Sequence, residues 1–120
     1  MKFVYLSYMK SLAIITLLLC SCSSLAQSKK EIIEISTSAV CGMCEETIEE
    51  HFMFEKGVRY ADLKLKENVL YIKYNPKKTN PATLRKSLTN IGYDADELLA
   101  NKKAYENLAL CCKKGSKCEH

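Results

Sequence analysis

The chain has 120 residues, a formal net charge of +4 at pH 7 and seven cysteines. This length accommodates one small domain with further segments at its ends. Lysine and arginine form no long run and aromatic residues do not alternate with them, which makes nucleic acid a poor candidate partner. The short motifs of phosphate-binding loops, metalloproteases and serine hydrolases are missing, so the sequence gives no support for an enzyme of these classes.

The first 26 residues have the pattern of a secretory signal peptide. Lys2 and Lys10 precede the apolar residues 12–20, and Ser24 and Ala26 are the small residues that a signal peptidase requires. The apolar stretch is shorter than the ~20 residues of a transmembrane helix. We therefore expect cleavage after Ala26 and localisation in the periplasm or outside the cell. Without Lys2 and Lys10 the net charge falls to about +2.

A lipoprotein is the less favoured form of the exported chain. The segment Leu19-Cys20-Ser21-Cys22 loosely resembles a bacterial lipoprotein cleavage box, in which Cys22 would carry the lipid. A cysteine at the second position of such a box is unusual, which favours cleavage after Ala26.

Five cysteines remain after residue 26, namely Cys41, Cys44, Cys111, Cys112 and Cys118. An exported protein can keep disulfides. However, an odd number leaves one cysteine over if all the others pair within the chain. A purely structural disulfide scaffold is therefore a weak interpretation.

The first half of the domain reads as a strand, a helix and a hairpin. Residues 31–36 are rich in β-branched side chains and predict a strand. The next helix begins near Cys44 and ends by Gly57, with Cys44, Ile48 and Phe52 on one face. Residues 58–66 and 69–74 then alternate with period two. A two-residue turn at Glu67 and Asn68 would pair Leu65 with Leu70, Leu63 with Ile72 and Ala61 with Tyr74.

The second half predicts another helix and a last strand. Asn80 is a good N-cap, Pro81 suits the first helical position, and Gly92 ends the helix. Residues 93–98 supply a short strand, and residues 102–108 a further helical turn. The order strand, helix, strand, strand, helix, strand predicts an α+β, ferredoxin-like βαββαβ sandwich with two helices on one face of an antiparallel sheet.

The segment Cys41-Gly42-Met43-Cys44 carries the most informative chemistry in the chain. Its cysteines lie where a loop enters a helix, and the unpaired N–H groups at a helix N-terminus stabilise a thiolate. Gly42 is expected to let the loop bend so that both sulfurs converge. Two thiolates without a carboxylate neighbour select soft ions: Cu(I) or Hg(II), and less typically Zn(II) or Cd(II). The same pair can instead form a redox disulfide, with Cys41 as nucleophile and Cys44 as resolving thiol.

The strand, the CxxC loop and the helix, set in this plan, resemble the heavy-metal-associated (HMA) domain family over residues 31–98. The family includes copper chaperones, N-terminal modules of metal-exporting P-type ATPases and the periplasmic mercury-binding protein. The resemblance implies that Cys41 and Cys44 bind one metal ion, and that the protein is a metallochaperone rather than an enzyme. A metal-transporting P-type ATPase or another membrane metal transporter is the partner it implies, with the chain itself a monomer.

Tyr93 agrees with the family pattern, whereas Ala39 departs from it. Bacterial members often have a Gly-Tyr pair near the end of the second helix, close to the metal loop, and Gly92-Tyr93 resembles it. Tyr93 is therefore a candidate to support the metal ligands. The family commonly has a methionine two residues before the first cysteine, where this chain has Ala39. Met43, between the cysteines, is a weaker candidate neighbour of the ion.

The last ten residues form a tract of soft ligands outside the domain, which we place at residues 27–100, with residues 101–120 as a short helix and tail. Its candidate ligands are Cys111, Cys112, Cys118 and His120. Such a composition is typical of metal binding, although the spacing fits no standard zinc motif. A disulfide from Cys111 or Cys112 to Cys118 is the alternative. In one version of the metal hypothesis, the tail folds back and completes the coordination at the CxxC loop.

Overall fold

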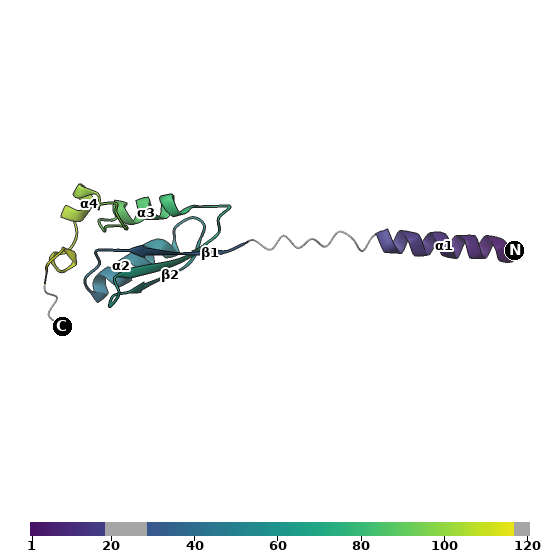
Figure 1. The fold of residues 1–120 in the computed structure, drawn as a ribbon, viewed down its shortest axis with the longest axis horizontal. Helices are drawn as coiled ribbons and strands as arrows, with labels where there is room; N and C mark the ends of the chain where they lie inside the picture. Colours follow the sequence, from purple (N-terminus) through teal and green to yellow (C-terminus); the bar gives the residue numbers. More distant parts are fainter. Residues whose placement is uncertain (19–28, 117–120) are drawn as a thin grey trace.

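The computed structural model describes residues 1–18 and 29–116. Figure 1 shows a sheet with helices packed on it, followed by a C-terminal segment that carries two short helices. In the described ranges, no helix is long and apolar enough to cross a membrane. The elements, in chain order, are α1 (Lys2–Leu18), β1 (Glu31–Ser36), α2 (Gly42–Met53), β2 (Val58–Lys64), β3 (Val69–Tyr74), α3 (Pro81–Asn90), α4 (Lys102–Glu106) and the 3-10 helix η2 (Leu110–Cys112).

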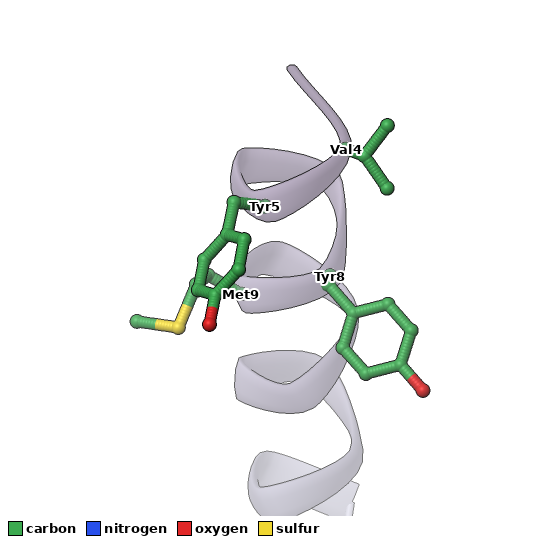
Figure 2. A pocket seen from close by; sticks show the side chains of 4 residues that line it. All are labelled: Val4, Tyr5, Tyr8 and Met9. Atoms are coloured by element: carbon green, nitrogen blue, oxygen red, sulfur yellow. The ribbon is translucent and has the colours of Figure 1, made fainter. Parts of the chain in front are cut away.

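Helix α1 lies within the expected signal peptide. Figure 2 shows a hollow on this helix, with Tyr5 and Met9 on one side and Val4 and Tyr8 on the other. Each of these side chains is at least 64% exposed, so none belongs to a packed core. The predicted cleavage point and the alternative acylation site, Ala26 and Cys22, lie outside the described residues.

The sheet has the strand order β1-β3-β2, and both strand pairs are antiparallel. Alternate strand residues point to one face, where Ile35, Leu70 and Ile72 are fully buried. Helix α2 covers this face with Cys44, Ile48 and Phe52, as their spacing predicts. Burial of each large apolar side chain contributes about 1.5–3 kcal/mol, so this layer holds the domain together. The predicted α+β, ferredoxin-like fold is confirmed.

The predicted register of the hairpin is wrong by two residues. Leu63 pairs with Leu70 and Ala61 with Ile72, because the turn spans four residues instead of two. Asn68 has a φ of 55°, a left-handed conformation that asparagine tolerates better than most residues. A shift of two residues leaves every side chain on its predicted face, so the apolar pattern could not distinguish the two registers.

The expected last strand, residues 93–98, is reduced to single bridges at Ala95, which pairs with Thr37 and with Leu98. Asp96 ends the pairing because its φ is 53° and its backbone turns away. Its carboxylate accepts a hydrogen bond from the N–H of Ser36 at 2.9 Å, and its own N–H donates to the carbonyl of Ser36 at 2.8 Å. A turn therefore satisfies backbone groups that a fourth strand would have paired.

Replacing Asp96 with asparagine is expected to destabilise the domain in a pH-dependent way. Partial burial acts to raise the pKa of Asp96, but hydrogen bonds from Arg85, at 2.6 Å, and from Ser36 outweigh it and hold this pKa below its usual value. A carboxylate with a lowered pKa adds stability above its unfolded pKa of about 3.9, and this is lost as the pH falls through the folded pKa. Asparagine also tolerates the left-handed backbone.

Urea unfolding followed by circular dichroism checks this prediction. The free energy of unfolding of Asp96→Asn should be below that of the wild type at neutral pH, and the two should converge as the pH falls below about 3.9. Glu97→Gln, at the exposed neighbouring position, is the control. A difference between Asp96→Asn and wild type that does not change with pH would contradict the assignment.

Candidate metal centre

The CxxC loop brings two thiols together at the N-terminus of α2. Cys41 is the N-cap residue, and its carbonyl accepts hydrogen bonds from the N–H groups of Cys44 at 3.0 Å and Glu45 at 3.1 Å. The two sulfurs are 3.4 Å apart, and the side chains are 5% and 0% exposed. A disulfide would hold them at ~2.05 Å. Two thiolates each ~2.3 Å from one ion lie roughly 3.8–4.6 Å apart, so a small opening of the pair would admit an ion.

Gly42 does not have the role that its sequence position suggests. It is the first residue of α2, and a Cβ there would meet no atom within 4 Å. The convergence of the sulfurs therefore comes from the extended N-cap conformation of Cys41 and the first helical turn, since alanine would fit at Gly42 equally well.

The C-terminal extension, residues 99–116, places two more thiols beside the loop. The sulfurs of Cys41, Cys111 and Cys112 all lie within 4.8 Å of one another. Cys112 is only 4% exposed, and Cys111 donates to the sulfur of Met43 at 3.7 Å. The loop and the tail, about 70 positions apart in the sequence, thus form one cluster of soft donors.

Cys112 is surrounded by polarisable groups inside this cluster. Burial raises the pKa of its thiol, and the neighbouring thiols of Cys44 and Cys111 raise it further, whereas contact with the Tyr93 hydroxyl lowers it. A metal that binds Cys112 must therefore displace its proton, which makes binding pH-dependent.

Tyr93 lies against the same sulfurs. It is 1% exposed, and within the described residues its hydroxyl makes no hydrogen bond of good geometry. Burial raises its pKa, with further contributions from the nearby thiols of Cys44 and Cys112. A buried hydroxyl beside thiols can donate to a sulfur once that sulfur is a thiolate, which would strengthen a charge-assisted hydrogen bond.

Replacing Tyr93 with phenylalanine is expected to leave the metal-free fold as stable as before or slightly more stable. A buried hydroxyl without a good partner contributes nothing to balance its desolvation. Affinity for Cu(I) should nevertheless fall about fivefold to tenfold, because the thiolates lose the hydrogen bond that the Tyr93 hydroxyl would donate to them. Thermal unfolding of the metal-free protein and competition with a Cu(I) chelator measure the two effects. A parallel loss of stability and affinity would instead indicate a purely structural tyrosine.

The extension is held on the domain by contacts around the end of α3. The N–H groups of Asn101 and Ala100 donate to the carbonyl of Thr89 and the carboxylate of Asp94, both at 2.9 Å. Lys114 pairs with Asp94 at 2.6 Å. Partial burial acts to raise the pKa of Asp94, but hydrogen bonds from Lys114 and Ala100 outweigh it and keep this pKa low. The Asp94 carboxylate is therefore charged at neutral pH and holds the extension.

Two contacts that join these segments were not predicted. Ser38, just before the loop, accepts a hydrogen bond from the N–H of Asp94 at 3.0 Å, and Asp94 pairs with Lys114. A serine in a loop and an Asp–Lys pair 20 residues apart give no signal in the sequence. Gly92 was predicted as a helix end, but its second role, close contact with Ala104 of α4, was not.

The remaining candidates are distributed as follows. His51, which was not among the candidate ligands, contacts Ser87 of α3 at 2.8 Å and Glu55 at 3.5 Å. Ala39 is 1% exposed, and Met43 is 53% exposed. Cys118 and His120 lie outside the described residues.

Comparisons with known proteins agree on the nature of this domain. Residues 38–94 match the family model of the heavy-metal-associated domain. A copper-exporting P-type ATPase of Staphylococcus epidermidis is 34% identical over 73 residues, which are 60% of this chain and 9% of that protein. The chain thus spans less than a tenth of that relative.

Two solved structures have the same fold. Oxidized MerP from Ralstonia metallidurans CH34 superimposes with a TM-score of 0.54 at 19% identity, over 57% of this chain and 96% of that chain. A putative copper-ion-binding protein from Bacillus anthracis gives 0.54 at 18% identity, over 58% and 100%. With its βαββα core and its CxxC loop at a helix N-terminus, the chain carries a heavy-metal-associated domain.

Proposed function

We propose that this protein is an exported carrier of one soft metal ion, Cu(I) or Hg(II), which it captures with Cys41 and Cys44. The observation that carries the proposal is the pair of thiols 3.4 Å apart at the N-terminus of α2. Paired thiolates prefer soft ions, and helix N–H groups stabilise their negative charge. Zn(II) and Cd(II) are weaker candidates for the loop alone, because both favour four ligands.

The carrier would buffer the ion or pass it to a membrane transporter. A copper-exporting P-type ATPase is among the proteins that the chain resembles, and solved proteins of the same fold include MerP and CopZ metallochaperone. A loop with two ligands suits transfer, because an acceptor thiolate can enter before a donor thiolate leaves. Export rests on the signal-peptide pattern of residues 1–26.

Anaerobic transfer of Cu(I) tests the proposal. The reduced chain is loaded with one equivalent of Cu(I) and mixed with the metal-free N-terminal domain of a copper-exporting ATPase, and the ion on each protein is followed after rapid separation. We expect Cu(I) to equilibrate between the two proteins faster than it is released to a chelator when the acceptor is absent. Direct ligand exchange avoids the free ion, which explains the difference.

The same preparation tests the competing oxidoreductase hypothesis. Catalytic reduction of insulin disulfides by the chain, together with failure to bind one equivalent of Cu(I) or Hg(II), would overturn the carrier. As a control, Gly42→Ala keeps both thiols and adds a Cβ that would meet no atom within 4 Å, so transfer by this variant should match the wild type.

A further inference from the structure

We infer that Cys111 and Cys112 complete the CxxC site, so that the chain holds its ion with three or four thiolates under the docked extension. This inference deepens the proposed function and rests on it. The cysteines of the extension lie outside the family match, which ends at Asp94. They are therefore a property of this chain and not of the shared domain.

The distances suit a shared ion. Three sulfurs ~2.3 Å from one ion in a trigonal plane lie ~4.0 Å apart, and four in a tetrahedron ~3.8 Å apart. The sulfurs of Cys41, Cys111 and Cys112 already lie within 4.8 Å of one another. Cys44, at 3.4 Å from Cys41 and in contact with Cys112, lies outside this group of three and would become the fourth ligand only if its sulfur moved closer to the group. Shifts of about 1 Å or less would bring the sulfurs of Cys41, Cys111 and Cys112 to the trigonal distance.

The extension is built to keep its thiols in place. The side chain of Ser116 donates to the carbonyls of Cys111, at 2.8 Å, and Lys113, at 2.6 Å, which fixes the turn that follows η2. Lys114 makes two contacts: its side chain forms an ion pair with Asp94 at 2.6 Å, and its backbone N–H donates a hydrogen bond to the Tyr105 hydroxyl at 3.0 Å. A preorganised ligand loses little conformational entropy on binding, so these contacts favour coordination by the extension.

The added thiolates change which ions the site accepts. Two thiolates suit ions of low coordination number, whereas Zn(II) and Cd(II) favour four ligands. A closed site of three or four thiolates binds such divalent ions as well, and it holds Cu(I) more tightly than the loop alone. Undocking of the extension would return the ion to the two-ligand loop, from which transfer is faster.

Titration of the reduced, full-length chain with Cd(II) alone tests the inference, because the thiolate-to-cadmium absorption per bound ion increases with the number of thiolates. Cys111→Ser/Cys112→Ser should lower this absorption to about half and weaken Cd(II) binding by at least about tenfold. Leu110→Ser, which changes the 81% exposed first residue of η2, is the matched control and should behave as wild type. Absorption and affinity of Cys111→Ser/Cys112→Ser equal to wild type would overturn the inference.

Further arms separate this inference from the proposed function. Normal Cu(I) binding by the loop, with no contribution from the extension to Cd(II) binding, would overturn the inference alone, whereas a chain that binds neither ion would overturn both. Cadmium bound with unchanged absorption in Cys41→Ser/Cys44→Ser would indicate an independent tail site and also overturn the shared one.

Alkylation of the wild-type chain gives a test that needs no variant. Cys111 is half-buried, whereas Cys44 and Cys112 are buried, so Cys111 should react faster with a maleimide than either of them. We expect one equivalent of Cd(II) to slow labelling of Cys111 at least about tenfold, as measured by mass spectrometry of peptides. Labelling of Cys111 at the same rate with and without Cd(II) would exclude it as a ligand.

Discussion

Cys41→Ser/Cys44→Ser is expected to lower Cu(I) affinity by about four orders of magnitude. Structural zinc sites with four ligands bind with about 10–16 kcal/mol, so one ligand accounts for roughly 3 kcal/mol. Two lost thiolates then remove roughly 6 kcal/mol, since each 1.4 kcal/mol is a factor of ten. Anaerobic competition with a Cu(I) chelator of known affinity measures the change.

Single variants and a neighbouring residue make this prediction specific. Cys41→Ser and Cys44→Ser should each lose about a hundredfold in affinity, by the same estimate per ligand. Met43→Leu should change affinity by less than about threefold, because its sulfur is a weak ligand and leucine fills similar space. Equal losses in Met43→Leu and in the cysteine variants would mean that loop packing, and not the thiolates, determines binding.

Gly92→Ala is expected to detach the extension while the domain core stays folded. Gly92 has a φ of 101°, and a Cβ there would lie 3.0 Å from the backbone of Ala104 and 3.1 Å from Leu108. Backbone strain and this clash together should lower the free energy of unfolding by about 1–3 kcal/mol. Metal affinity should fall to that of Cys111→Ser/Cys112→Ser, because the thiols of the extension move away from the loop.

Gly115→Ala is the matched control for this second prediction. Gly115 also has a left-handed φ, of 76°, but a Cβ there would meet nothing within 4 Å. The control therefore adds backbone strain without the clash against α4. Thermal unfolding of both variants measures the loss of stability, and Cd(II) titration shows whether the thiols of the extension still contribute. Comparing the two variants separates backbone strain from the clash against α4. Equal behaviour of Gly92→Ala and Gly115→Ala would show that close packing at Ala104 does not hold the extension.

Most of the fold follows from apolar spacing and capping residues. Cys44, Ile48 and Phe52 recur every four residues, and α2 buries these three side chains as predicted. Asn80 and Pro81 predict the start of α3, where the Asn80 side chain accepts a hydrogen bond from the N–H of Thr83. These signals are local, so the sequence expresses them without tertiary information.

The errors arise where tertiary geometry outweighs local pattern. Alternating apolar residues do not reveal whether a turn has two or four residues, because both keep the same faces buried. The sequence pattern predicts Asp96 within a strand, yet its side chain and left-handed backbone replace that strand. The two cysteines of the CxxC motif were found by spacing, whereas the position of Cys112 depends on contacts of Gly92 and Asp94 that no short pattern encodes.

The metal content of the native protein is the most direct test of the carrier. The wild-type chain would be purified without oxygen from the cells that make it, and its metals and thiol state would be measured by mass spectrometry. We expect one equivalent of copper or mercury per chain, bound by sulfur, with Cys41 and Cys44 reduced. A metal-free chain with Cys41 and Cys44 joined in a disulfide would contradict it.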